Sequence, residues 1–312
     1  MTGLPRNIFR LLRPRQWIKN FAIFAAVLFS GKLFDIGTLQ QLFLGFLVFC
    51  AISSAIYVIN DIFDAKKDRL HPFKRFRPIA KNDVSVKLAI LIVILLASCS
   101  LTASYFISPG FFAITFIYFI LHFSYSMFLK HIEIVDILTL AAGYILRVYA
   151  GEVISNSHIS AWLVLTTISL SLFLAIGKRR SELTLLSQQT KPLITTTRKT
   201  LSHYTEKLLD VYLSIFATST FISYALFTFL VNPTGAYSSA LLPDGFLGAS
   251  LQKKWLMLTI IPVVYGLMRY LQRIYENHEG ESPERVLFSD RPLLTSVVIW
   301  VLLTVGLIYI VG

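Results

Sequence analysis

Charged residues are scarce in this chain. Only 15% of its 312 residues are Asp, Glu, Lys or Arg, whereas 55% are hydrophobic and the mean hydropathy is +0.67. Soluble domains carry about 25% charged residues, so this composition excludes an ordinary soluble protein. Acids are rarer than bases, 17 against 29, which leaves a formal net charge of +12. The sequence predicts an integral membrane protein surrounded by membrane lipids, and we expect no nucleic-acid partner.

Cysteine and histidine are also rare. Cys50 and Cys99 both lie inside apolar runs, where a free thiol packs as a small hydrophobic side chain, so neither a disulfide framework nor a cysteine metal site is expected. The six histidines are scattered, and none has metal-ligand spacing with another. The sequence has no internal repeat, low-complexity tract or long linker, which predicts a single membrane-embedded domain over residues 1–312.

Long apolar runs recur along the whole chain. Each approaches the ~20 residues that an α-helix needs to cross a bilayer. The runs are continuous and lack the two-residue alternation of barrel strands, so we predict an all-α, polytopic membrane protein with nine transmembrane helices. The predicted spans cover residues 17–34, 38–59, 86–108, 110–129, 134–150, 159–177, 208–231, 254–271 and 292–311.

The distribution of cations predicts the orientation of these spans. If the N-terminus is cytoplasmic, nearly all of the 29 Lys and Arg residues fall in cytoplasmic segments, as the positive-inside rule requires. Lys32, Lys253 and Lys254 fall in loops on the other side. Arg147 lies within the fifth span, where we expect the nearby Glu152 to be its partner. We therefore expect a protein of the cell (inner or plasma) membrane, with its N-terminus and active site cytoplasmic and its C-terminus outside.

Three carboxylates follow the second predicted span, in the stretch "YVINDIFDAKKDRLHPFKRFRPIA". Asp61, Asp64 and Asp68 are spaced i, i+3 and i+7, so they share one face if the helix continues. Like charges on one face repel each other, and a divalent cation would reverse that interaction. Mg²⁺ prefers oxygen ligands and is typically held by carboxylates together with substrate phosphates. We predict a Mg²⁺ site on this stripe, although Asp68, between Lys67 and Arg69, also fits a solvated surface acid.

The second half of the same stretch is basic. Arg69, Lys74, Arg75 and Arg77 lie within nine residues. Arginine forks bind phosphate oxygens bidentately, and lysine adds a mobile point charge. Attraction to anionic lipid headgroups is the alternative reason for such a cluster. Because the cations stand beside three carboxylates, which a simple lipid anchor does not need, we favour binding of an anionic substrate.

A second charged motif, "GKRRSEL", ends the sixth predicted span. Lys178 and Glu182 are i, i+4 neighbours, and Arg179 lies beside them. A salt-bridged helix end explains this pattern equally well when it is taken alone. Lys19 in "RPRQWIKN", and Tyr125 and Lys130 in "SYSMFLKH", lie near the same membrane face. We predict as catalytic residues Asp61, Asp64 and Lys19, and as substrate-binding residues Tyr57, Asn60, Lys74, Arg75, Arg77, Tyr125, Lys130, Lys178, Arg179 and Glu182.

The motif "NDIFDAKKD" resembles the first signature, N-D-x-x-D-x-x-x-D, of the UbiA-type intramembrane prenyltransferase superfamily. The nine spans and a second charged motif after the sixth extend the resemblance over the whole chain, and they imply a UbiA-like helical bundle. Quinone and haem prenyltransferases of this superfamily carry a second aspartate-rich motif where this chain has "GKRRSEL". In this respect the chain is similar to the decaprenyl-phosphate phosphoribosyltransferase branch, whose members resemble "RPRQWIKN", "NDIFDAKKDRLHPFKRFRPIA", "SYSMFLKH" and "GKRRSEL" in this order.

The resemblance implies a reaction and its partners. The donor is 5-phosphoribosyl 1-diphosphate, the acceptor is a polyprenyl (decaprenyl-type) phosphate, and diphosphate is released. Mg²⁺ on Asp61, Asp64 and Asp68 would neutralise the departing diphosphate. The acceptor phosphate is already an anion, so no strong general base is required, and ribose C1 would pass through an oxocarbenium-like state stabilised by position and electrostatics.

Two other functions stay open at the level of sequence. One is an aromatic-acceptor prenyltransferase, in which a prenyl diphosphate is the electrophile at the same metal site. The absent second aspartate motif argues against it. The other is a non-catalytic polyprenyl-lipid carrier that uses its basic face as an anchor, and the acid stripe argues against that. The sequence also leaves open a homo-oligomer.

Overall fold

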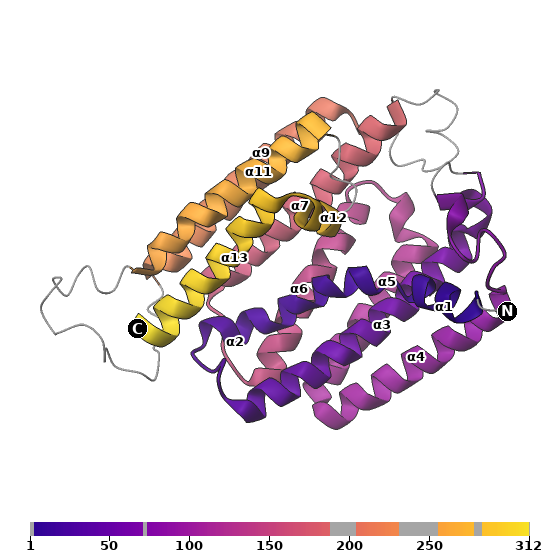
Figure 1. Ribbon diagram of the computed structural model, residues 1–312, viewed down its shortest axis with the longest axis horizontal. Helices are drawn as coiled ribbons and strands as arrows, with labels where there is room; N and C mark the ends of the chain where they lie inside the picture. The colour runs from indigo at the N-terminus through magenta and orange to yellow at the C-terminus, as the bar shows by residue number, and fades with distance from the viewer. Residues whose placement is uncertain (1–2, 71–73, 188–203, 231–254, 278–282, 312) are drawn as a thin grey trace, which may run out of the picture.

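The computed structural model describes residues 3–70, 74–187, 204–230, 255–277 and 283–311. Within these ranges every regular element is a helix, and the long helices form an elongated bundle (Figure 1). The predicted all-α membrane fold is therefore confirmed. The predicted loop 232–253 and part of the predicted loop 178–207 lie outside the described residues.

Eight helical stretches in the described ranges are long and apolar enough to cross a membrane. They correspond to the second through ninth predicted spans. The helices that form them are α3 (Ile36–Asp68), α4 (Val86–Ile107), α5 (Pro109–Met127), α6 (Val135–Ser155), α7 (Ala161–Ser187), α9 (Glu206–Leu230), α11 (Ile260–Asn277) and α13 (Arg291–Gly306).

Local signals in the sequence fix where several helices begin. The Asp35 side chain accepts a hydrogen bond from the Thr38 N–H at the start of α3, and Ser85 caps α4 in the same way. Pro109 is the first residue of α5, a position at which the helix makes no hydrogen bond from the backbone N–H that proline lacks. Asp290 caps α13. Side-chain caps satisfy backbone donors that the first helical turn leaves unpaired.

The first predicted span, 17–34, differs from a single long helix. It consists of a 3₁₀ helix, η1 (Pro14–Phe24), followed by the short helix α2 (Ala25–Phe29). At about 2 Å per residue the 3₁₀ segment spans roughly 22 Å, and it packs between α3 and α6. Gly151 on α6 permits this approach, because a Cβ there would lie 1.8 Å from the Ile23 carbonyl oxygen. Tertiary packing at this glycine therefore accommodates a tighter backbone than the apolar run predicts.

The helices differ in how much lipid they face. The apolar stretch of α3 is 67% buried within the bundle, whereas that of α4 is only 11% buried. One buried core joins α2, α3, α5 and α6, and a second joins α6, α7, α9, α11 and α13. Since α6 belongs to both cores, it connects the two halves of the bundle, as its central position in Figure 1 also shows.

Arg147 on α6 lies in the first of these cores and has neutral partners. Its guanidinium donates to Asn20 Oδ1 at 2.8 Å, the Gly143 carbonyl at 2.7 Å and Tyr118 OH at 2.6 Å. Glu152 instead accepts a hydrogen bond from a backbone N–H after α6. The expected pair of Arg147 with Glu152 is wrong, because residues five apart on a helix point about 140° away from each other.

The antiparallel course of the helices gathers the charged segments at one end of the bundle. Ion pairs join the ends of α3 and α5, the end of α7 to the starts of α6 and α9, and the end of α11 to the start of α13. Charged segments that are far apart in the sequence therefore lie at the same end of the bundle.

Candidate active site

The predicted acid stripe lies on the last turns of α3. This helix has 33 residues and is about 50 Å long at 1.5 Å per residue, whereas the hydrocarbon core of a bilayer is about 30 Å thick. One end must therefore project beyond the hydrocarbon. Asp61, Asp64 and Asp68 occupy the end opposite the Asp35 cap, which places ionised groups at the membrane boundary.

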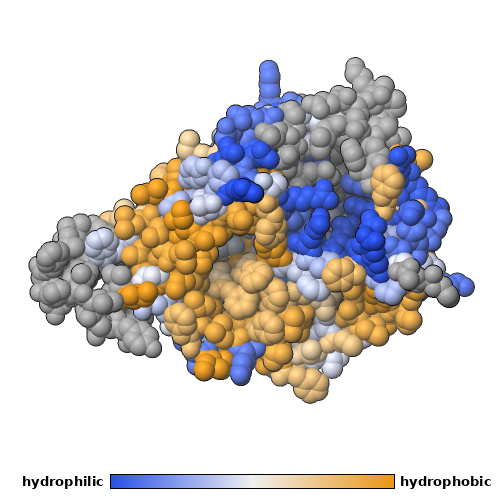
Figure 2. Space-filling model, viewed as in Figure 1, coloured by the Kyte–Doolittle hydropathy of each residue, from blue (hydrophilic) through white to orange (hydrophobic). Residues whose placement is uncertain are grey.

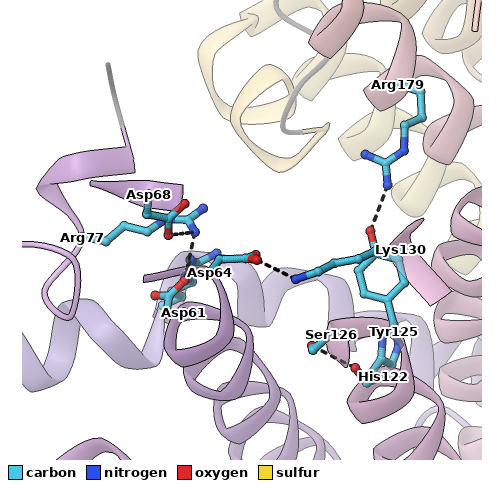
Figure 3. A network of polar contacts seen from close by, with 10 residues as sticks. Asp61, Asp64, Asp68, Arg77, His122, Tyr125, Ser126, Lys130 and Arg179 are labelled. Carbon is cyan, nitrogen blue, oxygen red and sulfur yellow. Dashed lines mark hydrogen bonds and ion pairs between the residues drawn. The ribbon is translucent and has the colours of Figure 1, made fainter. Parts of the chain in front are cut away.

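Two carboxylates of the stripe converge on one arginine. Arg77 Nη1 lies 3.0 Å from Asp61 Oδ1 and 2.7 Å from Asp68 Oδ2 (Figure 3). Arg13 Nη2 lies 2.5 Å from the same Asp61 oxygen. Burial alone would lower the pKa of Arg77, but Asp61 and Asp68 outweigh burial and raise it. A permanent positive charge therefore stands between two buried carboxylates.

Asp64, the third carboxylate, has a different partner. Lys130 lies in η3 (Leu129–His131), the turn that follows α5, and its Nζ is 2.6 Å from Asp64 Oδ1. Lys130 is only 4% exposed. In Figure 3 its side chain extends from the region of Tyr125 and Arg179 toward the acid stripe. Lys130 thus reaches the acid stripe from the turn after α5, the helix whose Tyr125 accepts a hydrogen bond from Arg179.

The donor atoms of the stripe suit Mg²⁺. Asp61 and Asp68 offer oxygen only, and both contact the same Arg77 nitrogen, so one positive centre can reach both carboxylates. Mg²⁺ is usually held by one or two carboxylates with waters and substrate phosphates. No group of three or more His, Cys, Asp or Glu side chains in the described ranges is arranged to hold a metal, because Asp64 turns toward Lys130. The arrangement fits a two-carboxylate site better than the predicted three, and the metal itself stays a prediction.

Arg179, near the end of α7, is fully buried. Its Nε donates to Asp136 at 2.6 Å, Nη1 to Glu182 at 2.5 Å and Nη2 to Tyr125 OH at 2.9 Å. The Tyr204 hydroxyl donates to the second Asp136 oxygen at 3.0 Å. Burial, together with the Asp136 charge, raises the pKa of Tyr204 to about 12. All three guanidinium nitrogens have protein acceptors, and the predicted contacts of Arg179 and Glu182 with substrate stay a prediction.

Lys178 differs from its neighbour. The predicted i, i+4 ion pair with Glu182 is wrong, because Glu182 pairs with Arg179 at i, i+3. We find no ion pair of Lys178 with any described residue, and its side chain is partly exposed. Of the three adjacent cations Lys178, Arg179 and Arg180, Lys178 is therefore the most exposed.

Lys19 in η1 pairs with the short helix α12 (Pro283–Ser289). Its Nζ lies 3.1 Å from Glu284 Oε2, and Gln16 donates to the other carboxylate oxygen. Burial alone would raise the pKa of Glu284. Lys19, a backbone hydrogen bond, Gln16 and Lys178 together hold it below its ordinary value. The first and last parts of the chain thus meet at the same polar site.

The surface reflects this division between polar site and apolar belt. In Figure 2 hydrophilic residues gather around a hollow on the face shown, and apolar residues cover most of the remaining surface that is not grey. Large apolar side chains of α4, such as Leu91, Ile94 and Leu95, are about 60% exposed, which suits contact with lipid. The site is therefore a polar recess at the edge of a lipid-facing bundle.

The UbiA prenyltransferase family matches residues 20–289, which include both charged constellations. The chain belongs to this family. Among its relatives, the decaprenyl-phosphate phosphoribosyltransferase of Corynebacterium glutamicum is 32% identical over 99% of this chain and 88% of its own length. The protein of the same name from Mycolicibacterium smegmatis is 33% identical over 96% of this chain and 92% of its own length.

Solved structures agree with the UbiA fold. A UbiA homologue from Archaeoglobus fulgidus, solved bound to GPP and Mg²⁺, matches with a TM-score of 0.70 and 20% identity. The match covers 97% of this chain and 99% of the homologue. At this identity the likeness shows the shared fold, so the predicted UbiA-like helical bundle is confirmed.

The remaining predicted residues of this UbiA-family site fall into two groups. Tyr57 is partly buried beside the stripe, with the Arg13 guanidinium 5.3 Å from its ring centroid. Asn60 and Lys74 are partly buried as well. Arg75 is exposed and lies over the Phe76 ring at 4.9 Å, so it does not join the acid stripe as Arg77 does.

Sequence reasoning did not assign three residues that pair with the predicted site residues. Arg13 binds Asp61, Asp136 binds Arg179, and Glu284 binds Lys19. The basic motif "RPRQWIKN" carried a signal for Arg13, and the acid at the start of the fifth span carried one for Asp136. Glu284 had no such signal, because nothing in its local sequence points to a partner near the N-terminus.

Proposed function

We propose that this UbiA-family protein transfers 5-phosphoribosyl from 5-phosphoribosyl 1-diphosphate to a polyprenyl phosphate and releases diphosphate. The single observation that carries the proposal is the charge of α7. At the end of this helix Asp136 and Glu182 neutralise Arg179, whereas Lys178 has no ion pair with any described residue. Both cations stand where other branches of the family have a second aspartate motif. The similarity to decaprenyl-phosphate phosphoribosyltransferases along nearly the whole chain supports the same reading.

Asp61 and Asp68 would hold Mg²⁺ in this reaction, with Asp64 beside them. When bound, the ion would supply positive charge that neutralises the leaving diphosphate. For this, Arg77 must move from between the two carboxylates, where it contacts both. Arg77 then becomes available for a phosphate oxygen, which its fork-shaped guanidinium suits.

Cations on the other side of the recess would hold the remaining phosphates. Lys178 is partly exposed, and Lys19 keeps 18% of its side chain exposed while paired with Glu284. Lys130 can exchange its Asp64 partner for a phosphate, as Arg77 can. The acceptor phosphate attacks ribose C1 as an anion, so the site needs no general base. Its described residues contribute orientation and positive charge, which are the main sources of catalysis in transfers between phosphate-bearing substrates.

A donor comparison tests this proposal. Purified protein in detergent with Mg²⁺ is given polyprenyl phosphate and labelled 5-phosphoribosyl 1-diphosphate, or an aromatic acceptor and labelled geranyl diphosphate. We expect a labelled lipid product only in the first mixture, and no product when EDTA replaces Mg²⁺. Product in the second mixture alone would contradict the proposal and favour a prenyl transfer of the kind that GPP in the Archaeoglobus homologue suggests.

A further inference from the structure

Glu284 is a buried carboxylate at the point where the N-terminal segment meets the connection between α11 and α13. It lies in the first turn of α12 and is 6% exposed. Its two carboxylate oxygens contact Lys19 and Gln16, which are both in η1. An ionised group loses much hydration energy on burial. The contacts with Lys19 and Gln16 compensate that loss and explain why a carboxylate is buried here.

The two side chains of the Lys19–Glu284 ion pair are exposed to different extents. The Lys19 side chain is 18% exposed, whereas that of Glu284 is 4% exposed. The cation is therefore the more accessible member of the pair, and the carboxylate is the more buried one. A ligand can therefore reach Lys19 more readily than Glu284.

The surroundings of Glu284 also indicate a place for an anion. Lys178 lies within electrostatic reach of Glu284 and contributes to its lowered pKa. Tyr270 of α11 is a second neighbour, and its buried hydroxyl has no hydrogen-bond partner among the described residues. Lys19 thus contacts Glu284 directly, and Lys178 lies within electrostatic reach of the same carboxylate. A phosphate group that reaches both lysines would receive two positive charges.

We propose that Glu284 is a positioning residue, which holds the Lys19 ammonium toward the recess so that Lys19 and Lys178 together receive a phosphate group of a substrate. The assignment rests on the proposed function for the identity of the substrates. Either 5-phosphoribosyl 1-diphosphate or the polyprenyl phosphate can supply this phosphate, and the kinetic test below distinguishes them. Glu284 acts through Lys19 and does not itself touch a substrate.

The test compares Glu284→Gln, Lys19→Met and the double variant by steady-state kinetics with each substrate varied in turn. Glu284→Gln keeps the shape of the side chain and removes its charge. We expect it to raise the KM for one of the two phosphate-bearing substrates about tenfold while kcat changes less than about threefold. Lys19→Met should raise the same KM. The double variant should match Lys19→Met, because Glu284 has no effect once its lysine is gone.

Asp290→Asn is the matched control, since Asp290 is another buried carboxylate on the same connection, at 4% exposed. It caps α13 and pairs with Arg269, so its loss should lower the melting temperature and leave both KM values unchanged. Glu284→Asp, which keeps the charge on a shorter side chain, should raise the same KM less than Glu284→Gln does. If Glu284→Gln does not fold, the double variant, which removes both charges of the pair, is compared with Lys19→Met alone.

Two results would overturn the positioning role. One is a Glu284→Gln protein with a lowered melting temperature and wild-type KM values, and the other is a double variant whose KM is the product of the two single effects. A wild-type enzyme that uses a prenyl diphosphate instead would refute the proposed function separately. The Glu284 comparison would then be made with that donor, and the same two results would decide it.

Discussion

Lys178 and Arg179 are neighbours in the sequence, yet the structure predicts opposite effects when each is replaced. Arg179→Met removes the partner of Asp136 and Glu182, which are 0% and 8% exposed. Breaking a buried ion pair from one side costs about 3–5 kcal/mol, because the remaining charge stays buried without compensation. Since native proteins are only about 5–15 kcal/mol stable, we expect Arg179→Met to lose folded protein, with a sharply lower melting temperature in detergent.

Lys178→Ala should leave stability nearly unchanged, because the lysine makes no ion pair with any described residue. If it contacts a donor phosphate, losing one charge-assisted hydrogen bond costs about 1.5–3 kcal/mol, which is roughly a ten- to hundredfold rise in the KM for 5-phosphoribosyl 1-diphosphate. The KM for polyprenyl phosphate should change much less. Thermal unfolding and steady-state kinetics on both variants measure these effects. An Arg179→Met protein that melts like wild type, or a Lys178→Ala protein that unfolds early with an unchanged KM, would refute this reasoning.

Three further predictions concern the metal, the packing and the topology. Asp61→Asn or Asp68→Asn should abolish turnover in protein that still inserts into membranes, and wild-type activity should disappear with EDTA and return with Mg²⁺; full activity in either variant would contradict the metal site. Gly151→Ala should prevent folding, because its Cβ would meet the Ile23 carbonyl oxygen, whereas Gly306→Ala has open space and should melt like wild type. Cysteines at positions 190 and 238, in a background without Cys50 and Cys99, should be labelled from opposite sides of the membrane, with position 190 inside; labelling from one side only would contradict the nine-span topology.

The parts of the fold that depend on local interactions could be predicted from local sequence patterns. Apolar runs of bilayer length predicted the eight long helices, because each such run must satisfy its own backbone hydrogen bonds in lipid. The spacing of Asp61, Asp64 and Asp68 predicted their common position at the end of α3. The first span could not be predicted in detail, since its 3₁₀ form depends on packing against Gly151, which is more than a hundred residues away.

The partners of the charged residues were predictable only in part. Helix spacing alone made Glu182 a partner of Lys178, but Arg179 competes for it and also binds Asp136 on another helix. Arg147 likewise binds residues on η1 and α5 and not the acid beside it on α6. These choices depend on which helices are neighbours in space. The pair of Lys19 with Glu284 is the extreme case, because it joins the two ends of the chain.

The most direct test of the central claim follows both parts of the donor through one turnover. Donor labelled in the ribose ring with ¹⁴C and in the β-phosphate with ³²P is incubated with enzyme, Mg²⁺ and polyprenyl phosphate. We predict that ¹⁴C enters the lipid phase, that ³²P appears in water as diphosphate, and that the two are formed in equal amounts. Transfer of ³²P to the lipid, or ¹⁴C remaining entirely in the aqueous phase while the enzyme is active with another donor, would contradict phosphoribosyl transfer at this site.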